Sequence, residues 1–127
     1  MATWEDVGVD NYRTAVELFG AGGSRYRSTI SRFYYATFSL LTYELIRQNA
    51  PFHAGRATPS HNELPGLIQI HLTQFSEERR GNLAQTMSEL YRDRLGADYS
   101  VLRVDKTAAR ESYRRATRVF TYFGVKL

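Results

Sequence analysis

The 127-residue sequence predicts an all-α fold, an up-and-down antiparallel four-helix bundle with an additional short helix, in a single domain of residues 1–127. Two observations predict this class. Apolar residues recur at helical spacing in segments separated by turns rich in Gly or Pro, and no segment shows the alternation of polar and apolar residues that is typical of strands. A chain of this length buries roughly two-thirds of its unfolded surface, so it can fold without a disulfide or a metal.

The first helix is expected over about Asp10 to Phe19, before a glycine-rich turn. Its inner face carries Tyr12, Ala15, Val16 and Phe19. Three glycines between residues 20 and 23 end this helix, and Ser24 can cap the helix that follows. The two helices are therefore expected to be antiparallel neighbours in the bundle.

The longest predicted helix runs from Tyr26 to Gln48, a segment with no Gly or Pro. Apolar and aromatic side chains occupy most of its circumference, which is typical of a central, largely buried helix. At about 100° per residue, one narrow polar sector remains. This polar seam consists of Ser28, Ser31, Arg32, Tyr35, Ser39 and Thr42. Tyr34 and Tyr35 are interpreted as core or interface aromatics, with base stacking as the alternative.

A loop with two prolines and a glycine follows at residues 51–59. Ser60 and Glu63 then form the Ser-x-x-Glu pattern of a capping box, which predicts a third helix from about His61 to Phe75. His61 at the start of this helix has two interpretations. Its side chain is either hydrogen-bonded locally or part of a functional site.

The fourth helix is expected to begin near Ser76 and to end before Gly96, and Gly81 is a point at which it can break. Its apolar stripe consists of Leu83, Met87, Leu90 and Tyr91. Helical rotation places Arg94 near the middle of this stripe, where a leucine would be expected. Desolvating an unpaired guanidinium costs several kcal/mol. Arg94 is therefore predicted either to pair with an internal carboxylate such as Asp98 or to line a wet cleft open to a ligand.

The last helix is predicted to begin after the capping residue Asp105 and to end at about Phe123, before Gly124. Its inward residues are Ala109, Tyr113, Ala116, Phe120 and Phe123. An adjacent face carries the Arg ridge, which consists of Arg110, Arg114 and Arg118. The ridge is interpreted as a solvated face, as a strip that follows phosphates, or as a surface for an acidic partner.

The composition restricts the classes of function. Cysteine is absent, which excludes a disulfide framework, a zinc knuckle and a thiol nucleophile. The N-terminus has acidic residues where a signal peptide is basic, and no apolar run approaches the length of a membrane span, so we expect a cytoplasmic protein with no membrane contact. No Gly-rich phosphate loop and no metal-ligand spacing occurs, so neither a cofactor nor a metal is expected.

The formal charge is +4, and only Lys106 and Lys126 of the 17 basic residues are lysines. This arginine excess suits phosphate contacts but is also typical of a GC-rich genome.

Three short motifs occur in order along the chain. Residues 31–38 read SRFYYATF, Ser60 and His61 open the third helix, and residues 94–99 read RLGADY. In these motifs the chain resembles the HEPN family of prokaryotic helical proteins, in particular the branch that pairs an SR-x-YYA-x-F helix with a later R-x-x-ADY element. The resemblance extends from about residue 11 to residue 123.

The resemblance implies a four-helix bundle with an extra helix, often a homodimer, encoded in toxin–antitoxin and other defence or stress loci. Many HEPN proteins are metal-independent ribonucleases that act through an Arg-x4–6-His element. Others are non-catalytic partners of a minimal nucleotidyltransferase. The chain is accordingly expected to bind RNA, a nucleotide or a partner protein.

The sequence departs from the catalytic pattern of the family. No histidine follows Arg94, and Asp98, Tyr99 and Ser100 occupy the positions at which it would fall. Ser39 also stands where this branch commonly has a histidine after the aromatic run. Cleavage of RNA without a metal needs a group that titrates near neutrality, and a tyrosine with a pKa of about 10 or an aspartate with a pKa of about 4 serves poorly.

Two hypotheses remain open. In the enzyme hypothesis, an endoribonuclease uses Arg94 to stabilise the phosphorane-like transition state, and Asp98, Tyr99 or His61 handles protons. In the alternative, the chain is a homodimeric interaction module that docks on a nucleotidyltransferase or nuclease partner and does not touch RNA.

The polar seam is expected to form the site in either case. We predict that Arg32, Tyr35 and Ser39 of the long helix face Arg94 and Asp98 of the fourth helix across a single cleft.

Overall fold

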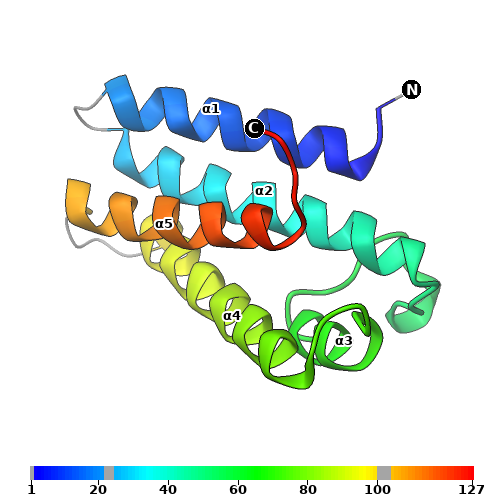
Figure 1. Cartoon of the computed structure of the whole chain (residues 1–127). Coiled ribbons are helices and arrows are strands. Elements are labelled where there is room, and N and C mark those ends of the chain that lie inside the picture. The colour runs from blue at the N-terminus through cyan, green and yellow to red at the C-terminus, as the bar shows by residue number, and fades with distance from the viewer. Residues whose placement is uncertain (1, 22–24, 100–103) are drawn as a thin grey trace.

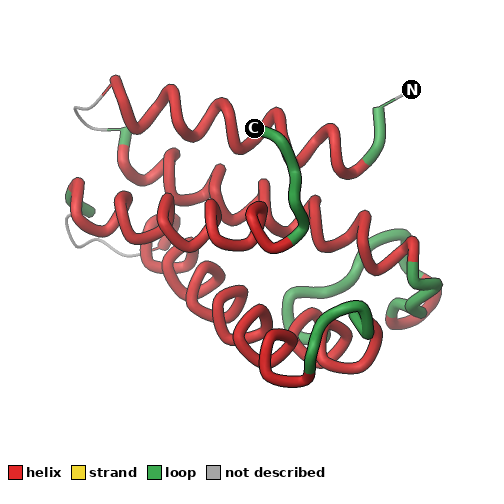
Figure 2. Tube along the Cα trace, viewed as in Figure 1, coloured by secondary structure: helices red, strands yellow, loops and turns green. Residues whose placement is uncertain are grey.

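The computed structural model describes residues 2–21, 25–99 and 104–127, and these segments contain helices and loops but no strand (Figures 1 and 2). The elements are α1 (Trp4–Ala21), α2 (Tyr26–Arg47), the short 3-10 turn η1 (His53–Gly55), α3 (Leu64–His71), α4 (Glu77–Tyr99) and α5 (Lys106–Tyr122). The long helices α1, α2, α4 and α5 alternate in direction along the chain (Figure 1). The predicted all-α class is therefore confirmed, and the additional short helix is α3.

Helix α1 begins six residues earlier than predicted, so the expected start at Asp10 was wrong. The cause is a capping interaction in which the backbone N–H of Thr3 donates to Asp6 Oδ2 at 2.9 Å and that of Asp6 donates to Thr3 Oγ1 at 3.1 Å. Gly8, in the added part of the helix, lies directly against α2. A Cβ at this position would lie 2.9 Å from the carbonyl oxygen of Ala36, so only glycine allows this approach.

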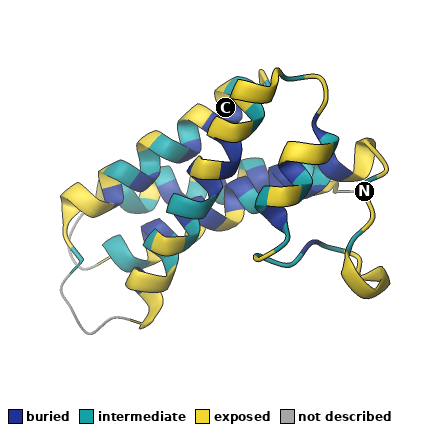
Figure 3. Ribbon diagram, turned by 90° about the horizontal axis from the view of Figure 1, so that it is seen from below, coloured by how far each residue is buried: buried dark blue, intermediate teal, exposed yellow. Residues whose placement is uncertain are grey.

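Helix α2 is the buried centre of the molecule, as predicted, and its bounds agree with the expected ones within one residue at its C-terminus. It packs against all four other α-helices. Viewed from below in Figure 3, the buried residues gather between the helices. The proposed capping residue Ser24 lies outside the described residues, as do two of the three glycines before it.

Helix α3 is shorter than the predicted segment from His61 to Phe75. The two hydrogen bonds of the predicted capping box form, from the N–H of Ser60 to Glu63 Oε2 at 2.9 Å and from the N–H of Glu63 to Ser60 Oγ at 3.2 Å. They close a turn before the helix, however, and α3 begins at Leu64 with Glu63 as its N-cap, so the expected start at His61 was wrong. The helix ends at His71, and the chain turns there. After this turn the ring centroid of Phe75 lies 5.1 Å from that of Phe123.

Helix α4 is continuous, so both the break considered at Gly81 and the end expected before Gly96 were wrong. No atom lies within 4 Å of the Cβ that either glycine lacks, so neither position is forced out of the helix by packing. The consequence is functional. Because the helix extends to Tyr99, Arg94 and Asp98 stand one turn apart on one face.

Helix α5 confirms its predicted caps. The N–H of Ala108 donates to Asp105 Oδ1 at 3.0 Å, and Gly124 has a φ of +65° just beyond the C-terminus. Arg115 ties α5 to α4 through Asp93 at 2.8 Å and Glu89 at 3.1 Å.

Candidate functional site

Arg94 projects from α4 toward α2, and its side chain is 14% exposed. Its Nε atom lies 3.1 Å from Asp98 Oδ2, although not in hydrogen-bond geometry. Its guanidinium carbon lies 5.0 Å from the ring centroid of Tyr35 and 5.9 Å from that of Tyr34. The inward arginine is thus compensated by a carboxylate and by two aromatic faces.

An open cleft of about 620 Å³ lies beside this pair, between α2 and α4. We call it the α2–α4 cleft. It is lined by Arg27, Ser28, Ser31, Arg32, Tyr35, Ala97, Asp98 and Tyr99. The predicted pairing of Arg94 with Asp98 is therefore confirmed, and Asp98, but not Arg94 itself, lines the cleft.

Hydrogen bonds across the cleft hold the two helices together. Ser31 Oγ donates to Asp98 Oδ1 at 2.5 Å, and Arg27 Nη1 donates to the carbonyl oxygen of Ala97 at 2.7 Å. Arg32 is exposed, and its Nη1 donates to Asn11 Oδ1 of α1 at 2.9 Å. Since Ser31 and Arg94 engage one oxygen of Asp98 each, this carboxylate is a structural partner rather than a free base.

The structure brings together Arg32, Tyr35, Arg94 and Asp98, as the sequence predicted, but not Ser39. Ser39 is 4% exposed and does not line the cleft. It lies one turn beyond Tyr35, where α2 has entered the core. The serine of the seam that contacts α4 is instead Ser31.

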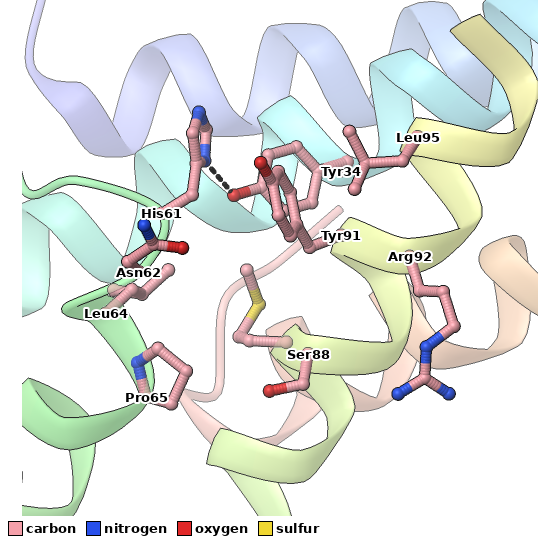
Figure 4. Close-up of a pocket in the computed structure, with 10 residues that line it drawn as sticks. Tyr34, His61, Asn62, Leu64, Pro65, Ser88, Tyr91, Arg92 and Leu95 are labelled. Carbon is pink, nitrogen blue, oxygen red and sulfur yellow. Dashed lines mark hydrogen bonds between the residues drawn. The ribbon is translucent and has the colours of Figure 1, made fainter. Parts of the chain in front are cut away.

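A second, smaller cavity of about 330 Å³ lies farther along α4, beside His61 (Figure 4). We call it the His61 cavity. Its lining residues are Tyr34, His61, Asn62, Leu64, Pro65, Met87, Ser88, Tyr91, Arg92 and Leu95. The His61 ring stacks on Tyr91 with 4.8 Å between centroids, and its Nδ1 atom is hydrogen-bonded to the hydroxyl of Tyr34.

The surroundings of His61 favour its neutral form. Burial lowers the pKa of His61, and the positive charges of Arg94 and Arg56 lower it further. Burial also raises the pKa of Tyr34, so its phenol stays protonated. The phenol can donate to Nδ1, which leaves the imidazole proton on Nε2, or it can accept from Nδ1–H, which leaves Nε2 as a base.

Tyr34 and Tyr35 connect the cavity with the cleft. Tyr34 is 1% exposed and lines the cavity, whereas Tyr35 is 37% exposed and lines the cleft. Their ring centroids are 5.6 Å apart, and the guanidinium of Arg94 lies close to both rings. The interpretation of Tyr34 as a core aromatic is thereby confirmed, and Tyr35 occupies a surface position.

The remaining predicted residues lie apart from this centre. Tyr99 is 72% exposed at the end of the cleft. All three residues of the Arg ridge are exposed, and none lines the cleft or the cavity. Arg114 of the ridge is paired with Glu111 at 2.5 Å.

Sequence reasoning missed Arg27, Tyr91 and the Tyr34–His61 bond. Arg27 was recognisable, because it precedes Ser31 by four residues and so lies on the same helix face. Tyr91 had been assigned to the apolar stripe, and nothing in the sequence relates His61 to Tyr34. Among the described residues, no group of histidines and carboxylates could hold a metal ion, and no helix is long and apolar enough to cross a membrane.

The fold and the site together define a small helical bundle with a basic, hydroxyl-lined cleft next to an aromatic cavity. No protein-family model, no curated protein and no solved structure matches the chain.

Proposed function

We propose that the protein is a HEPN-like RNA-binding component of a prokaryotic toxin–antitoxin or defence module, and that the α2–α4 cleft is its RNA site. The observation that carries this proposal is the position of Arg94 against Tyr35 at the edge of the cleft. The order of the three sequence motifs adds the resemblance to that family, which implies a homodimer, and we place the protein in the cytoplasm as part of the same proposal.

The chemistry of the cleft suits a single strand of RNA. Arg27, Arg32 and Arg94 supply three positive charges at or beside the cleft, against the one negative charge of Asp98. Guanidinium groups bind phosphates in a forked geometry, and the half-exposed aromatic rings in the cleft offer faces on which bases stack. Hydroxyls of the seam can hydrogen-bond to the sugar–phosphate backbone.

Binding of a fluorescent hexaribonucleotide tests this function. Arg32→Ala should weaken binding about fivefold to tenfold and reduce the slope of log K against log salt by about one, because one phosphate contact is lost. Arg13→Ala, an exposed arginine of α1, is the matched control and should leave both quantities unchanged. Equal binding by the wild-type protein and Arg32→Ala would exclude the cleft as the RNA site.

The Tyr34–His61 bond supports a second candidate function, a metal-independent endoribonuclease. Here the 2′-oxygen of the RNA attacks the adjacent phosphorus, the bond to the 5′-oxygen breaks, and a 2′,3′-cyclic phosphate and a 5′-hydroxyl result. A neutral His61 with a basic Nε2 accepts the 2′ proton, a solvent water donates a proton to the leaving 5′-oxygen, and Arg94 stabilises the charged phosphorane. Asp98 is less suited to these roles because Ser31 and Arg94 engage its two oxygens, and Tyr99 is less suited because its side chain is largely exposed.

Cleavage of bulk RNA in excess EDTA tests the enzyme. His61→Gln and Arg94→Lys should each lower the rate by a factor of a hundred or more, whereas His53→Gln should not. Cleavage that is unchanged in both site variants would point to a contaminating nuclease.

The exposed Arg ridge favours the alternative, a non-catalytic module that docks on an acidic surface of a nucleotidyltransferase or nuclease. Replacing Arg110 and Arg118 by Ala should then abolish complex formation with the product of the adjacent gene, without any effect of Arg32→Ala. Complex formation that tolerates loss of the ridge would reject this role for α5.

A further inference from the structure

We propose that the His61 cavity binds one nucleobase of the RNA strand whose phosphates occupy the α2–α4 cleft. This inference rests on the proposed RNA-binding function and assigns to it a base-recognition pocket. The shared chemistry is that of a planar heterocycle with polar edges, which either an RNA strand or a free nucleotide can supply.

The size and walls of the cavity fit a base. Its volume of about 330 Å³ is at the low end of small-molecule sites, so it suits a group of nucleoside size rather than a large cofactor. Leu64, Met87 and Leu95 give it apolar walls, as the flat faces of a base require. Figure 4 shows Leu64 and Pro65 from the α3 side opposite Ser88 and Tyr91 from α4.

Polar groups stand where the edges of a base need them. Asn62 is exposed at the border of the cavity, and its amide can both donate and accept, as a base edge does. Ser88 Oγ donates to the carbonyl of Ala84 at 3.1 Å but keeps lone pairs that can accept from an exocyclic amine.

The cavity lies within reach of a strand that is bound in the cleft. Tyr91 of the cavity and Asp98 of the cleft are separated by about 10 Å along α4, at 1.5 Å per residue. Tyr34 of the cavity and Tyr35 of the cleft have ring centroids 5.6 Å apart, and the guanidinium of Arg94 lies close to both rings. A short oligonucleotide bridges this length, with a phosphate near Arg94 and the next base turned into the cavity.

Methyl NMR of the wild-type protein tests the pocket directly. The chain has 2 methionines, and Met87 lines the cavity, so a sample labelled with ¹³C at the methionine methyl groups gives a specific probe. A hexaribonucleotide and AMP should each shift the Met87 signal, whereas ribose 5-phosphate, which lacks the base, should not.

A cavity-filling variant tests the contribution to affinity. Ser88→Phe should weaken hexaribonucleotide binding about tenfold, the value of one stacked base, and should abolish the effect of AMP on Met87. Gln85→Phe, at an exposed position of the same helix outside the cavity, is the matched control. If Ser88→Phe does not fold, the NMR comparison of AMP with ribose 5-phosphate decides alone.

The outcomes separate the pocket from the proposed function. RNA binding that depends on Arg32 but neither shifts Met87 nor responds to Ser88→Phe would overturn the base pocket and leave the RNA-binding function intact. If the hexaribonucleotide does not bind but AMP shifts Met87, the pocket takes the base of a free nucleotide, and the RNA assignment is overturned. If neither ligand shifts Met87, the pocket is rejected.

Discussion

At the residue scale, the position of Arg94 follows from the balance between desolvation and pairing. A guanidinium at a position suited to leucine is tolerated because Asp98 lies one helical turn away and two tyrosine rings present their faces to it. Ser31 then fixes the second oxygen of Asp98. The contacts with Asp98, Tyr34 and Tyr35 thus allow the charge of Arg94 to be partly buried beside the cleft, which Asp98 and Tyr35 line.

Asp98→Asn should lower the free energy of unfolding by about 1–2 kcal/mol, because a partly buried guanidinium loses its counter-charge while the hydrogen bond from Ser31 can remain. Urea denaturation at pH 7 measures the change. Asp10→Asn, at an exposed position of α1, is the control and should stay within about 0.5 kcal/mol of the wild type. An unchanged midpoint for Asp98→Asn would mean that the aromatic faces alone compensate Arg94.

His61 should make stability depend on pH on the acidic side of neutrality. Its pKa is lowered in the folded state by burial, so the unfolded chain binds the proton more strongly. Stability is therefore complete above the unfolded-state pKa of about 6.5 and falls as the pH decreases below it. Urea midpoints at pH 7.5, 6.5 and 5.5 should show this decline in the wild type.

His61→Gln should flatten the pH dependence of stability, because glutamine does not titrate. His53→Gln removes an exposed histidine and should retain the decline seen in the wild type. If His61→Gln retained the full decline, the titrating group would have to lie elsewhere in the fold.

At the scale of elements, the crossing of α1 and α2 depends on one glycine. The Cβ of an alanine at position 8 would meet backbone atoms of α2, which cannot move without separating the helices. Gly8→Ala should therefore destabilise the fold by about 1–3 kcal/mol despite the better helix propensity of alanine. Gly81→Ala is the matched control, since it is helical with no atom nearby, and should stabilise by about 0.5–1 kcal/mol. Thermal unfolding should show a lower Tm for Gly8→Ala and a higher Tm for Gly81→Ala. A change of Tm that is equal in the two variants would contradict this account of the crossing.

The elements also show which features a sequence reveals. Strong local signals, such as the capping box at Ser60 and the caps of α5, were predicted correctly because the atoms involved lie within a few residues. The break considered at Gly81 was wrong because glycine only weakens a helix, and the packing of the flanking turns overrides this preference. The start of α1 was missed although its cap is also local: Thr3 and Asp6 carry the signal.

The candidate site could be predicted only in part for the same reason. Helical periodicity places Arg32 and Tyr35 on one sector of α2, and Arg94 and Asp98 on one sector of α4. The two sectors meet in the structure, because Arg32, Tyr35 and Asp98 line the same cleft. Periodicity does not say how deeply each turn is buried, which is why Ser39 was misplaced. The Tyr34–His61 bond joins residues 27 positions apart through a loop, and its geometry depends on where that loop returns.

At the scale of the whole molecule, RNA binding should be visible as stability. A ligand present at a hundred times its Kd stabilises the folded state by about 2.7 kcal/mol if it does not bind the unfolded chain. For a domain of this size we expect a rise of about 5–10 °C in Tm with the hexaribonucleotide. The upper part of this range requires that the unfolded chain, with its formal charge of +4, binds RNA weakly.

Two variants separate RNA binding at the α2–α4 cleft from attraction by the overall charge of the chain. Arg32→Ala removes one charge from both the folded and the unfolded chain, and so does Arg13→Ala, so non-specific attraction falls equally in the two. Only Arg32→Ala removes a charge from the cleft, and it should lose about a third to a half of the Tm rise, whereas Arg13→Ala should keep it. Thermal scans with and without RNA at 100 mM salt measure both. An equal loss in the two variants would show that the basic character of the chain, and not the α2–α4 cleft, attracts RNA.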